Sequence, residues 1–285
     1  GSVISGTGVH NFFNIIIAGS NITAAATSSI SIGGNLTTIS PGVFTHLPGG
    51  TLTMSGAEKS ISGTGITLDN VTVTGTVSSS SSILITGSIS VTGSFTSNSP
   101  GNILMNGTTK TIGGGGTILF SSLQVSGTVT ASSGFSISQS LDVSGALSAT
   151  AGTATFTGTS TLNGTANLFN VTINGTSLIL SASSVLGIAN TFIITAGSLN
   201  VSSNKPNTVI FNGTGAQTVN ALTYHHLALA NGNTKTAAAG ITVNGNITIS
   251  PSTSFNAGSF THTLSGNWIN SGTFSAGTST VQMTG

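Results

Sequence analysis

The residues of this chain that could do chemistry are few and far apart. Glu58, Asp69 and Asp142 are its only carboxylates, and four lysines supply its only permanent positive charges. Enzymes that cleave polysaccharides need a pair of carboxylates, or a strong base beside a metal ion or a cationic clamp. The three carboxylates fall at different positions relative to the recurring glycines, so no two are expected on one face. The sequence therefore predicts that the protein is not an enzyme and has no catalytic residues.

The histidines do not form a recognisable metal site. The five are His10, His46, His225, His226 and His262. His225 and His226 are adjacent, and adjacent residues of a strand point to opposite sides of the sheet. Cysteine is absent, which excludes thiolate zinc sites, and the repeated aspartates of a calcium-binding solenoid are missing. We therefore expect neither a bound metal ion nor a cofactor.

Composition and charge exclude further classes of function. The 285 residues include 2% charged residues and carry a formal net charge of +1, so the chain has little charge with which to attract nucleic acid or an anionic membrane. The most hydrophobic stretch, residues 178–199, is interrupted by serine, threonine and asparagine and keeps the repeat pattern of its neighbours. We therefore expect no nucleic-acid partner and no membrane-spanning segment. Apolar residues make up 37% of the chain, which favours a folded protein over a disordered one.

The chain is organised by a repeat. An apolar residue, a spacer and a glycine recur in phase, and the glycines that close the long repeats are Gly56, Gly107, Gly158, Gly213 and Gly285. Recurrence of this kind is the sequence signature of stacked repeats. We therefore expect a single solenoid domain, 1–285, of five long repeats: 1–56, 57–107, 108–158, 159–213 and 214–285. Shorter intervals between such markers average about 18 residues and predict about 16 coils, and coils of about 25 residues are the rival interpretation.

The pattern between the glycines is alternation of apolar and polar residues. Segments 88–92 and 246–250 alternate in this way, and no window has the periodicity and capping residues of a helix. Strands this short cannot bury their apolar side chains alone, but stacked coils bury a continuous core and pair their backbone groups. The sequence thus predicts an all-β fold, a β-solenoid of short parallel strands with almost no helix. Tandem small β-sandwiches are the alternative, although these strands are short and large aromatic cores are lacking.

The repeated textures also resemble a known group of proteins. Residues 120–127 read Phe-x-x-Leu-x-Val-x-Gly, and residues 272–277 read Gly-x-Phe-x-Ala-Gly. They are similar to the Thr/Gly/Asn-rich repeats of bacterial surface β-solenoids, which include autotransporter passengers, haemagglutinin-like adhesins and extracellular matrix-fibre proteins. The resemblance covers essentially the whole chain and is one of texture and period. It implies an exported, extended, non-enzymatic protein that is extracellular or lies at the cell surface.

The repeat and the resemblance together predict a structural function, as a subunit of an extracellular filament, sheath or adhesin stalk. The first and last coils carry no polar cap and fall in phase with the repeat, so we expect them to stack head-to-tail on other copies of the chain. A longer polypeptide that continues in repeat phase is the alternative, and it would make the same junction covalent. The residues expected at the junction are Val3, Ile4, Phe12, Ile15, Ile17, Trp268, Phe274, Val281 and Met283.

A surface binding module is the competing function. Threonines spaced by one residue, such as Thr51 and Thr53, place hydroxyl groups on one face of a strand. A Thr/Asn-rich face of this kind could hold carbohydrate, including glycans on other cells, or order water as ice-binding solenoids do. Ten Asn-x-Ser/Thr sequences are candidate glycosylation sites. Their asparagines are Asn21, Asn35, Asn70, Asn106, Asn163, Asn170, Asn174, Asn200, Asn212 and Asn246.

Overall fold

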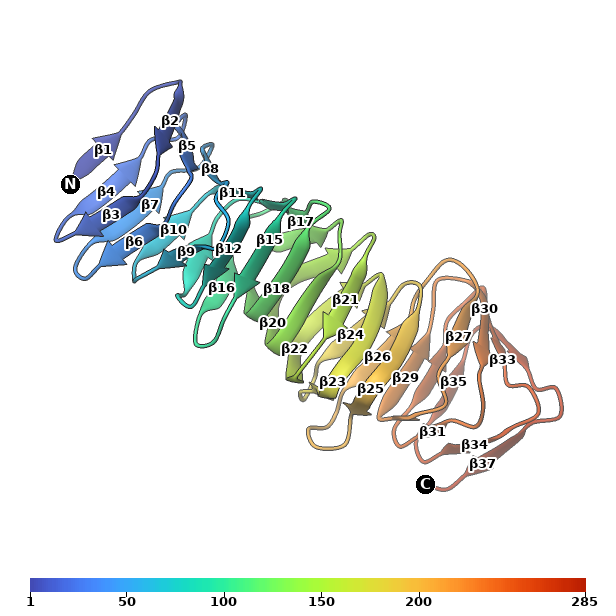
Figure 1. Cartoon of the computed structure of the whole chain (residues 1–285). Helices are drawn as coiled ribbons and strands as arrows, with labels where there is room; N and C mark the ends of the chain where they lie inside the picture. Colours follow the sequence, from blue (N-terminus) through green and yellow to red (C-terminus); the bar gives the residue numbers. More distant parts are fainter. The chain divides into compact units, whose positions relative to one another are not determined.

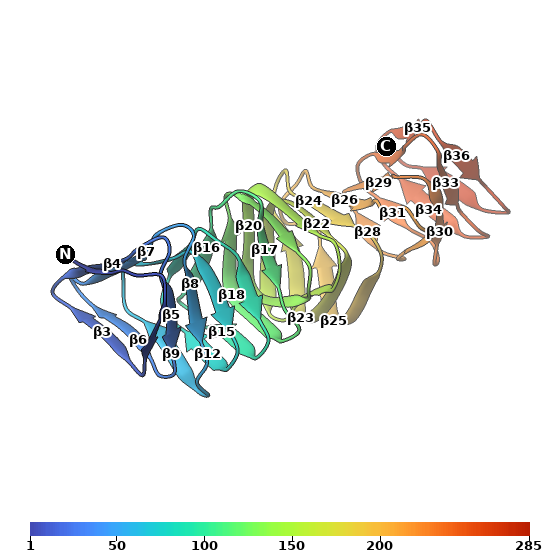
Figure 2. The same cartoon turned by 90° about the horizontal axis from the view of Figure 1, so that it is seen from above.

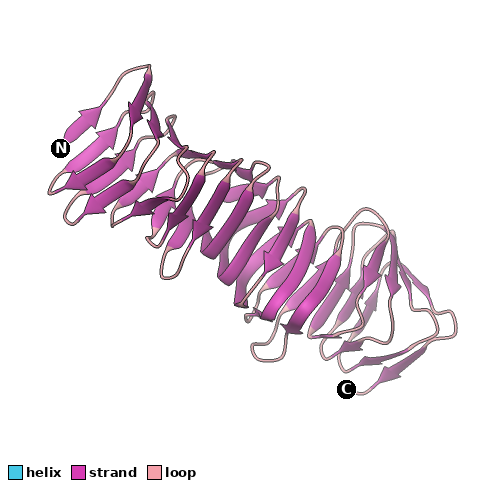
Figure 3. Cartoon of the chain, viewed as in Figure 1, coloured by secondary structure: helices cyan, strands magenta, loops and turns pink.

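The computed structural model describes residues 1–285 as 37 strands joined by turns (Figures 1 and 3). It confirms the all-β solenoid, with about 14 stacked turns, parallel strand pairing and no helix. The chain forms two compact units, residues 1–152 and 153–285. Each turn contributes strands to three sides, and Figure 2 shows strands of successive turns lying side by side within each unit.

In residues 1–152 the three sides are continuous parallel sheets. The first sheet contains β1 (Ser2–Ile4), β4 (Asn21–Ala24), β7 (Val43–His46), β10 (Ile66–Leu68), β13 (Ile83–Ile85) and β16 (Asn102–Met105). The second contains β2 (Val9–Phe12), β5 (Ser29–Ile32), β8 (Thr51–Met54), β11 (Asn70–Val73), β14 (Ile89–Val91), β17 (Lys110–Gly113) and β19 (Thr128–Ala131). The third contains β3 (Ile15–Ala18), β6 (Leu36–Ile39), β9 (Lys59–Ser62), β12 (Thr76–Ser79) and β15 (Ser94–Ser97). The long strands β18 (Thr117–Val125) and β20 (Phe135–Ala149) pass around corners and pair in more than one sheet.

In residues 153–285 one side is continuous and the other two are each divided into an earlier and a later group. The continuous side contains part of β22 (Thr159–Leu168), then β24 (Val185–Ile188), β26 (Thr208–Phe211), β29 (His226–Leu229), β32 (Ile247–Ile249) and β35 (Trp268–Asn270). The earlier strands of the other sides are β21 (Thr153–Phe156), β23 (Asn170–Leu180) and β25 (Phe192–Asn200), together with the first part of β22. The later strands are β27 (Gln217–Val219), β30 (Asn233–Ala237), β33 (Thr253–Asn256) and β36 (Thr273–Ser275) on one side. On the last side they are β28 (Thr223–Tyr224), β31 (Thr242–Val243), β34 (Thr261–Leu264) and β37 (Thr280–Met283).

The core consists of columns of apolar side chains that run from turn to turn. Alternate residues of each strand point inward, so residues in register on successive turns stack along the column. One column of the first sheet contains Phe44, Ile66, Ile83, Ile103 and Leu123, all buried. This arrangement is the one that the alternation in the sequence predicts, because strands of three or four residues bury only one or two side chains each.

Glycine recurs at the corners because successive turns approach closely there. A Cβ atom added to Gly75 would lie 2.1 Å from the carbonyl oxygen of Gly56, and one added to Gly93 would lie 2.0 Å from that of Gly75. Such corners explain the repeated glycine marker. Not all of these glycines occupy the same corner, since Gly56 follows β8 of the second sheet and Gly107 follows β16 of the first.

The placement of the markers explains why their spacing overestimates the number of coils. An interval between markers at two different corners is not a full turn, so counting every interval gives about 16 coils instead of about 14. The number of residues per turn also varies. Residues paired on successive turns are 17 positions apart in the sequence at Ile66 and Ile83, and 25 positions apart at Leu36 and Ile61. Both predicted coil lengths therefore occur as local values.

Side-chain amides satisfy backbone groups at other corners. Asn14 Oδ1 accepts the backbone N–H of Asn35 at 2.7 Å, and Asn35 Oδ1 accepts that of Ser60 at 2.9 Å. Asn246 Oδ1 accepts the N–H of Asn267 in the same way, at 3.0 Å. Each asparagine thus pairs a donor of the following turn where the strand ladder is interrupted.

Candidate interaction surfaces

The first-turn surface is the free edge of β1, β2 and β3. These strands pair only with β4, β5 and β6, so their opposite edge has no strand partner. Ile4, Phe12 and Ile15 lie in the inward columns, opposite Ala24, Ile32 and Leu36, and Phe12 remains 37% exposed. An unpaired edge with partly exposed core residues is a template for another turn.

Two other residues predicted for this junction are placed differently. Ile17 lies in an inward column but is only 3% exposed, because β6 covers it. Val3 is opposite Thr23 on the outer side of the sheet and is 64% exposed. Alternation along β1 therefore makes Ile4 rather than Val3 the core-side residue of that strand.

The last-turn surface is the free edge of β35, β36 and β37. These strands pair only with β32, β33 and β34. The four residues predicted there, Trp268, Phe274, Val281 and Met283, all occupy inward columns, opposite Ile247, Phe255, His262 and Leu264. The rings of Trp268 and Phe274 pack edge to face with centroids 4.7 Å apart, and Met283 is 57% exposed. The structure thus brings these four residues together at one edge.

Hydroxyl groups form short columns on the outer surface. Thr23, Thr45 and Thr67 are in register on three successive turns of the first sheet, and the next residue in that column is Leu84. On the second sheet Ser31, Thr53, Thr72 and Ser90 are in register on four turns, followed by Gly113. The predicted threonine pair Thr51 and Thr53 lies on this face. The columns are ordered but limited to a few turns.

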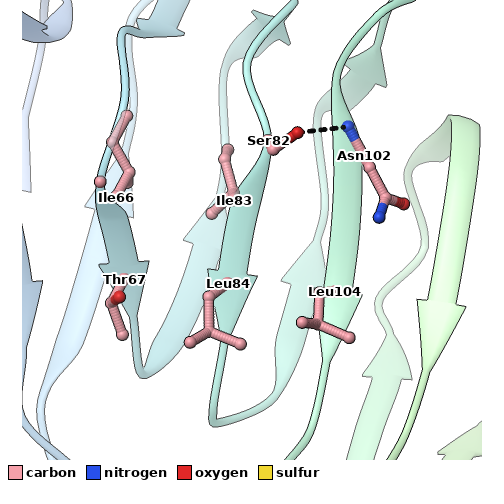
Figure 4. A pocket seen from close by; sticks show the side chains of 8 residues that line it. Ile66, Thr67, Ser82, Ile83, Leu84, Asn102 and Leu104 are labelled. Carbon is pink, nitrogen blue, oxygen red and sulfur yellow. Dashed lines mark hydrogen bonds between the residues drawn. The ribbon is translucent and has the colours of Figure 1, made fainter.

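An outer pocket lies where the threonine column ends. It has a volume of about 280 Å³ and is lined by residues of β10, β13 and β16 and by the corners before them (Figure 4). Leu84 and Leu104 form an apolar wall, and Asn102 donates its backbone N–H to Ser82 Oγ at 3.4 Å. Thr67 and Ser82 add hydroxyl groups, but no ionisable side chain lines the pocket. Its chemistry is that of a weakly polar contact surface.

The three carboxylates lie on different turns of residues 1–152. Asp69 is buried, and its oxygens accept hydrogen bonds from the backbone N–H of Gly49 at 2.7 Å, from Asn70 Nδ2 at 2.8 Å and from Thr86 Oγ1 at 3.0 Å. Asp142 accepts a hydrogen bond from Ser140 Oγ at 2.7 Å. Glu58 is exposed in a turn, with φ of 55°. The buried Asp69 therefore stabilises a corner through these three hydrogen bonds.

The two adjacent histidines lie together rather than on opposite sides of a strand. His225 is the corner residue between β28 and β29, so the strand geometry assumed from sequence does not apply, and the ring centroids are 4.3 Å apart. His226 Nδ1 accepts the backbone N–H of Asn246 at 2.9 Å. Burial, and then the neighbouring His225, lowers the pKa of His226. No group of three histidine, cysteine, aspartate or glutamate residues that could hold a metal ion is present.

One lysine is buried, which sequence reasoning missed. Lys235 occupies an inward column between Gln217 and Phe255 and is 0% exposed. Its Nζ donates hydrogen bonds to the carbonyl oxygens of Gly213 and Gly215. Burial lowers its pKa. The alternation along residues 233–237, with Lys235 and Ala237 in phase, is the signal that could have placed it inside.

The asparagines of the ten Asn-x-Ser/Thr sequences differ in the availability of Nδ2, the atom that would carry a glycan. Asn70 Nδ2 donates to Gly50 O and Asp69 Oδ2, Asn200 Nδ2 to Ser203 Oγ, and Asn212 Nδ2 to Asn167 Oδ1. Asn163, Asn170 and Asn246 are half-buried. The exposed asparagines are Asn21, Asn35, Asn106 and Asn174. Geometry therefore favours these four.

No protein-family model, curated protein or solved structure matches the chain. No helix is both long and apolar enough to cross a membrane. The findings identify the chain at the level of its fold, as a β-solenoid repeat protein.

Proposed function

We propose that the protein is a structural subunit of an extracellular filament, sheath or adhesin stalk, and that copies stack head-to-tail through the first-turn and last-turn surfaces. The observation that supports this most is the pair of free edges, each formed by three strands that are paired on one side only and that carry apolar side chains in the core columns. Stacking would continue both the backbone ladders and the core. A contact between two different surfaces does not close on itself, so it grows a filament.

The composition supports the same proposal. The chain carries four basic and three acidic residues, and none of the residues proposed for the junction is charged. Burying those apolar side chains is favourable by about 25 cal/mol per Å² of apolar surface, and no ionic group has to be desolvated. Where a polypeptide continues in repeat phase, the same edges would be covered by its own next turn.

A double substitution at the last-turn surface tests the proposal. The purified 285-residue chain is expected to form ordered filaments, visible by electron microscopy and by sedimentation. Replacing Val281 and Met283 with lysine puts two charges into the core columns of the free edge and is expected to abolish filaments while leaving the melting transition in place.

The matched control uses the outward residues of the same strand. Thr280 and Gln282 alternate with Val281 and Met283 and are exposed, so T280K/Q282K adds the same charge to the other side of β37. This variant is expected to assemble. Filament growth by the Val281/Met283 lysine variant, or equal loss in both variants, would show that end-to-end stacking through the core columns is wrong.

The second candidate function is a surface binding module for carbohydrate or ice. The observation in its favour is the register of the hydroxyl columns, Thr23–Thr45–Thr67 and Ser31–Thr53–Thr72–Ser90. This function predicts a persistent monomer with saturable binding to a glycan array, or with thermal hysteresis in ice. Replacing Thr45 and Thr53 with lysine should abolish such binding without affecting filament growth.

A further inference from the structure

A break in strand pairing lies inside residues 153–285. Neither part of β25 pairs with the turn that follows it, and the strands of that turn, β27 and β28, begin separate four-stranded sheets. The third side is uninterrupted, because β26 pairs with β24 before it and with β29 after it. We call the region between β25 and the β27–β28 turn the seam. Two of the three ladders are therefore missing at this one position.

Side chains replace the missing ladder on one side of the seam. Gln217 Nε2 donates to the carbonyl oxygens of Ile188 at 2.9 Å and Asn190 at 3.0 Å, while its Oε1 accepts the N–H of Gly213 at 2.8 Å. Asn220 Nδ2 donates to Phe192 O at 3.1 Å. Hydrogen bonds of this kind fix the rotamers of the glutamine and asparagine side chains, which costs side-chain entropy. Hydrogen bonds between backbone groups fix no side-chain rotamer. The side-chain hydrogen bonds therefore make a weaker joint than two continuous ladders.

One core column beside the seam begins with polar residues, at positions where most columns hold apolar side chains. Gln217 and Lys235 are the first two residues of one inward column of the β27 side, and both are buried, whereas the other column begins with Val219 and Ala237. Asn207, at the end of the loop that leads from β25 into β26, is also buried and donates to the carbonyl oxygens of Val201 and Asn204. The column of Gln217 and Lys235 therefore contributes less apolar surface to the joint than a column of apolar side chains would.

Two hollows mark the places where packing across the seam is incomplete. One, of about 420 Å³, lies between β25 and β28 and is lined by residues that include Leu199, Val201 and Leu222. The other, of about 250 Å³, lies between the start of β25 and β27, beside Ile193 and Thr218. Ile193 is 52% exposed. Missing ladders, polar core residues and two hollows thus coincide at one turn.

We propose that the seam is a built-in hinge. The continuous ladder of β24, β26 and β29 acts as its axis, and the β27 and β28 sides swing away from β25 while the turns on either side stay folded. Local opening of a fold occurs most readily where ladder hydrogen bonds and apolar contacts are fewest. In a filament the hinge would give each subunit one defined point of bending. The inference rests on the fold alone and holds whether or not the chain assembles.

Thiol labelling tests the hinge directly, because the chain contains no cysteine. Single Val→Cys variants at Val201 and Val219 report on the two faces of the seam, and both side chains are buried in the closed state. Matched variants at Val171 and Val209 report on strands that are paired on both sides, β23 and β26. All four substitutions remove the same atoms, and the melting transition of each variant shows whether it remains folded.

The expected result is that V201C and V219C are labelled at least about 10-fold faster than V171C and V209C under native conditions. Q217L removes the two hydrogen bonds across the seam, to Ile188 O and Asn190 O, together with the local bond from the N–H of Gly213. Adding it should accelerate labelling at Cys-substituted Val219, with no change at Val171. Equal labelling rates at all four positions would overturn the hinge. So would acceleration at every position by Q217L, since it would indicate global rather than local opening.

Discussion

At the first residue of β29 a histidine, His226, occupies a position that asparagine fills elsewhere. His226 Nδ1 accepts the N–H of Asn246, and Asn246 Oδ1 in turn accepts that of Asn267. The corner therefore requires an acceptor at a given place rather than a particular residue. Histidine at this position makes the stability of the fold depend on pH, because the nitrogen of histidine that accepts the hydrogen bond can be protonated and the amide oxygen of asparagine is not.

Replacing His226 with asparagine is expected to make the fold less sensitive to acid. The pKa of His226 is lowered below its ordinary value of 6.5, so the unfolded chain binds a proton that the folded chain resists. The contribution of His226 to the free energy of unfolding is therefore fully present above the pKa of histidine in the unfolded chain. It is lost as the pH falls towards the lower pKa of His226 in the folded chain. Urea unfolding from about pH 7.5 down to pH 5 should show this loss in the wild type and less of it in H226N.

The control is H226A, which removes the acceptor as well as the titrating ring. It should be less stable than H226N by about 1 kcal/mol at neutral pH, because the N–H of Asn246 loses its partner. Equal pH dependence in the wild type and H226N would contradict the assignment of the titration to His226.

Lys235 gives a second prediction of the same sign at higher pH, because its pKa is also lowered in the folded chain. Lysine in the unfolded chain titrates at 10.5, and the pKa of Lys235 in the folded chain is lower. As the pH rises, the folded chain therefore releases this proton first. Wild-type stability should therefore rise with pH between the lowered pKa and 10.5, and K235M should lack this rise. The exposed Lys205 provides the control, since K205M should keep the wild-type slope in unfolding experiments. A K235M slope equal to that of the wild type would place the titration elsewhere.

At the scale of the element, the corner glycines determine how closely turns stack. G75A puts a Cβ atom 2.1 Å from the carbonyl oxygen of Gly56, so the corner must open. We expect a loss of about 1–3 kcal/mol in the free energy of unfolding. G115A is the control, because a Cβ atom there has no neighbour within 4 Å, and it should change stability by less than about 0.5 kcal/mol. Equal effects of the two substitutions would show that corner packing does not explain the glycine repeat.

Much of the element level could be predicted from sequence because it depends on local patterns. The alternating segments 88–92 and 246–250 bury Ile89, Val91, Ile247 and Ile249, and the glycine marker reflects the close approach of corners such as Gly75. The number of turns could not be counted in the same way, because the marker occurs at more than one corner. The seam was not predicted either, since Gln217 and Asn220 compensate for missing ladders through contacts 29 and 28 residues away in the chain.

The residues of the proposed junction could also be predicted only in part from the sequence. Trp268, Phe274, Val281 and Met283 were predicted from the absence of a polar cap, and the register places all four in core columns. Val3 was predicted at the junction as well, whereas the pairing of β1 with β4 turns it outward. Sequence therefore identified the terminal turns, and only the strand register distinguished their inner from their outer residues.

At the scale of the whole molecule, the scarcity of charge determines how the proposed assembly should respond to salt. The net charge is +1 and the proposed junction residues are uncharged, so screening by sodium chloride has little to act on. Sulfate should strengthen assembly, since it is excluded from apolar surface and favours its burial. The critical concentration for filament growth, measured by sedimentation, should stay within about 2-fold between 0.05 and 1 M sodium chloride and should fall in sodium sulfate.

The variant T280K/Q282K makes this prediction sharper. It adds two positive charges on the outer side of β37 beside an unchanged core column, so any repulsion between subunits should be relieved by sodium chloride. Its critical concentration should therefore fall towards the wild-type value as the salt concentration rises, while that of the wild type stays constant. A wild-type assembly that dissolves at high sodium chloride would indicate an ionic contact between subunits, and would locate the junction away from the uncharged first-turn and last-turn surfaces.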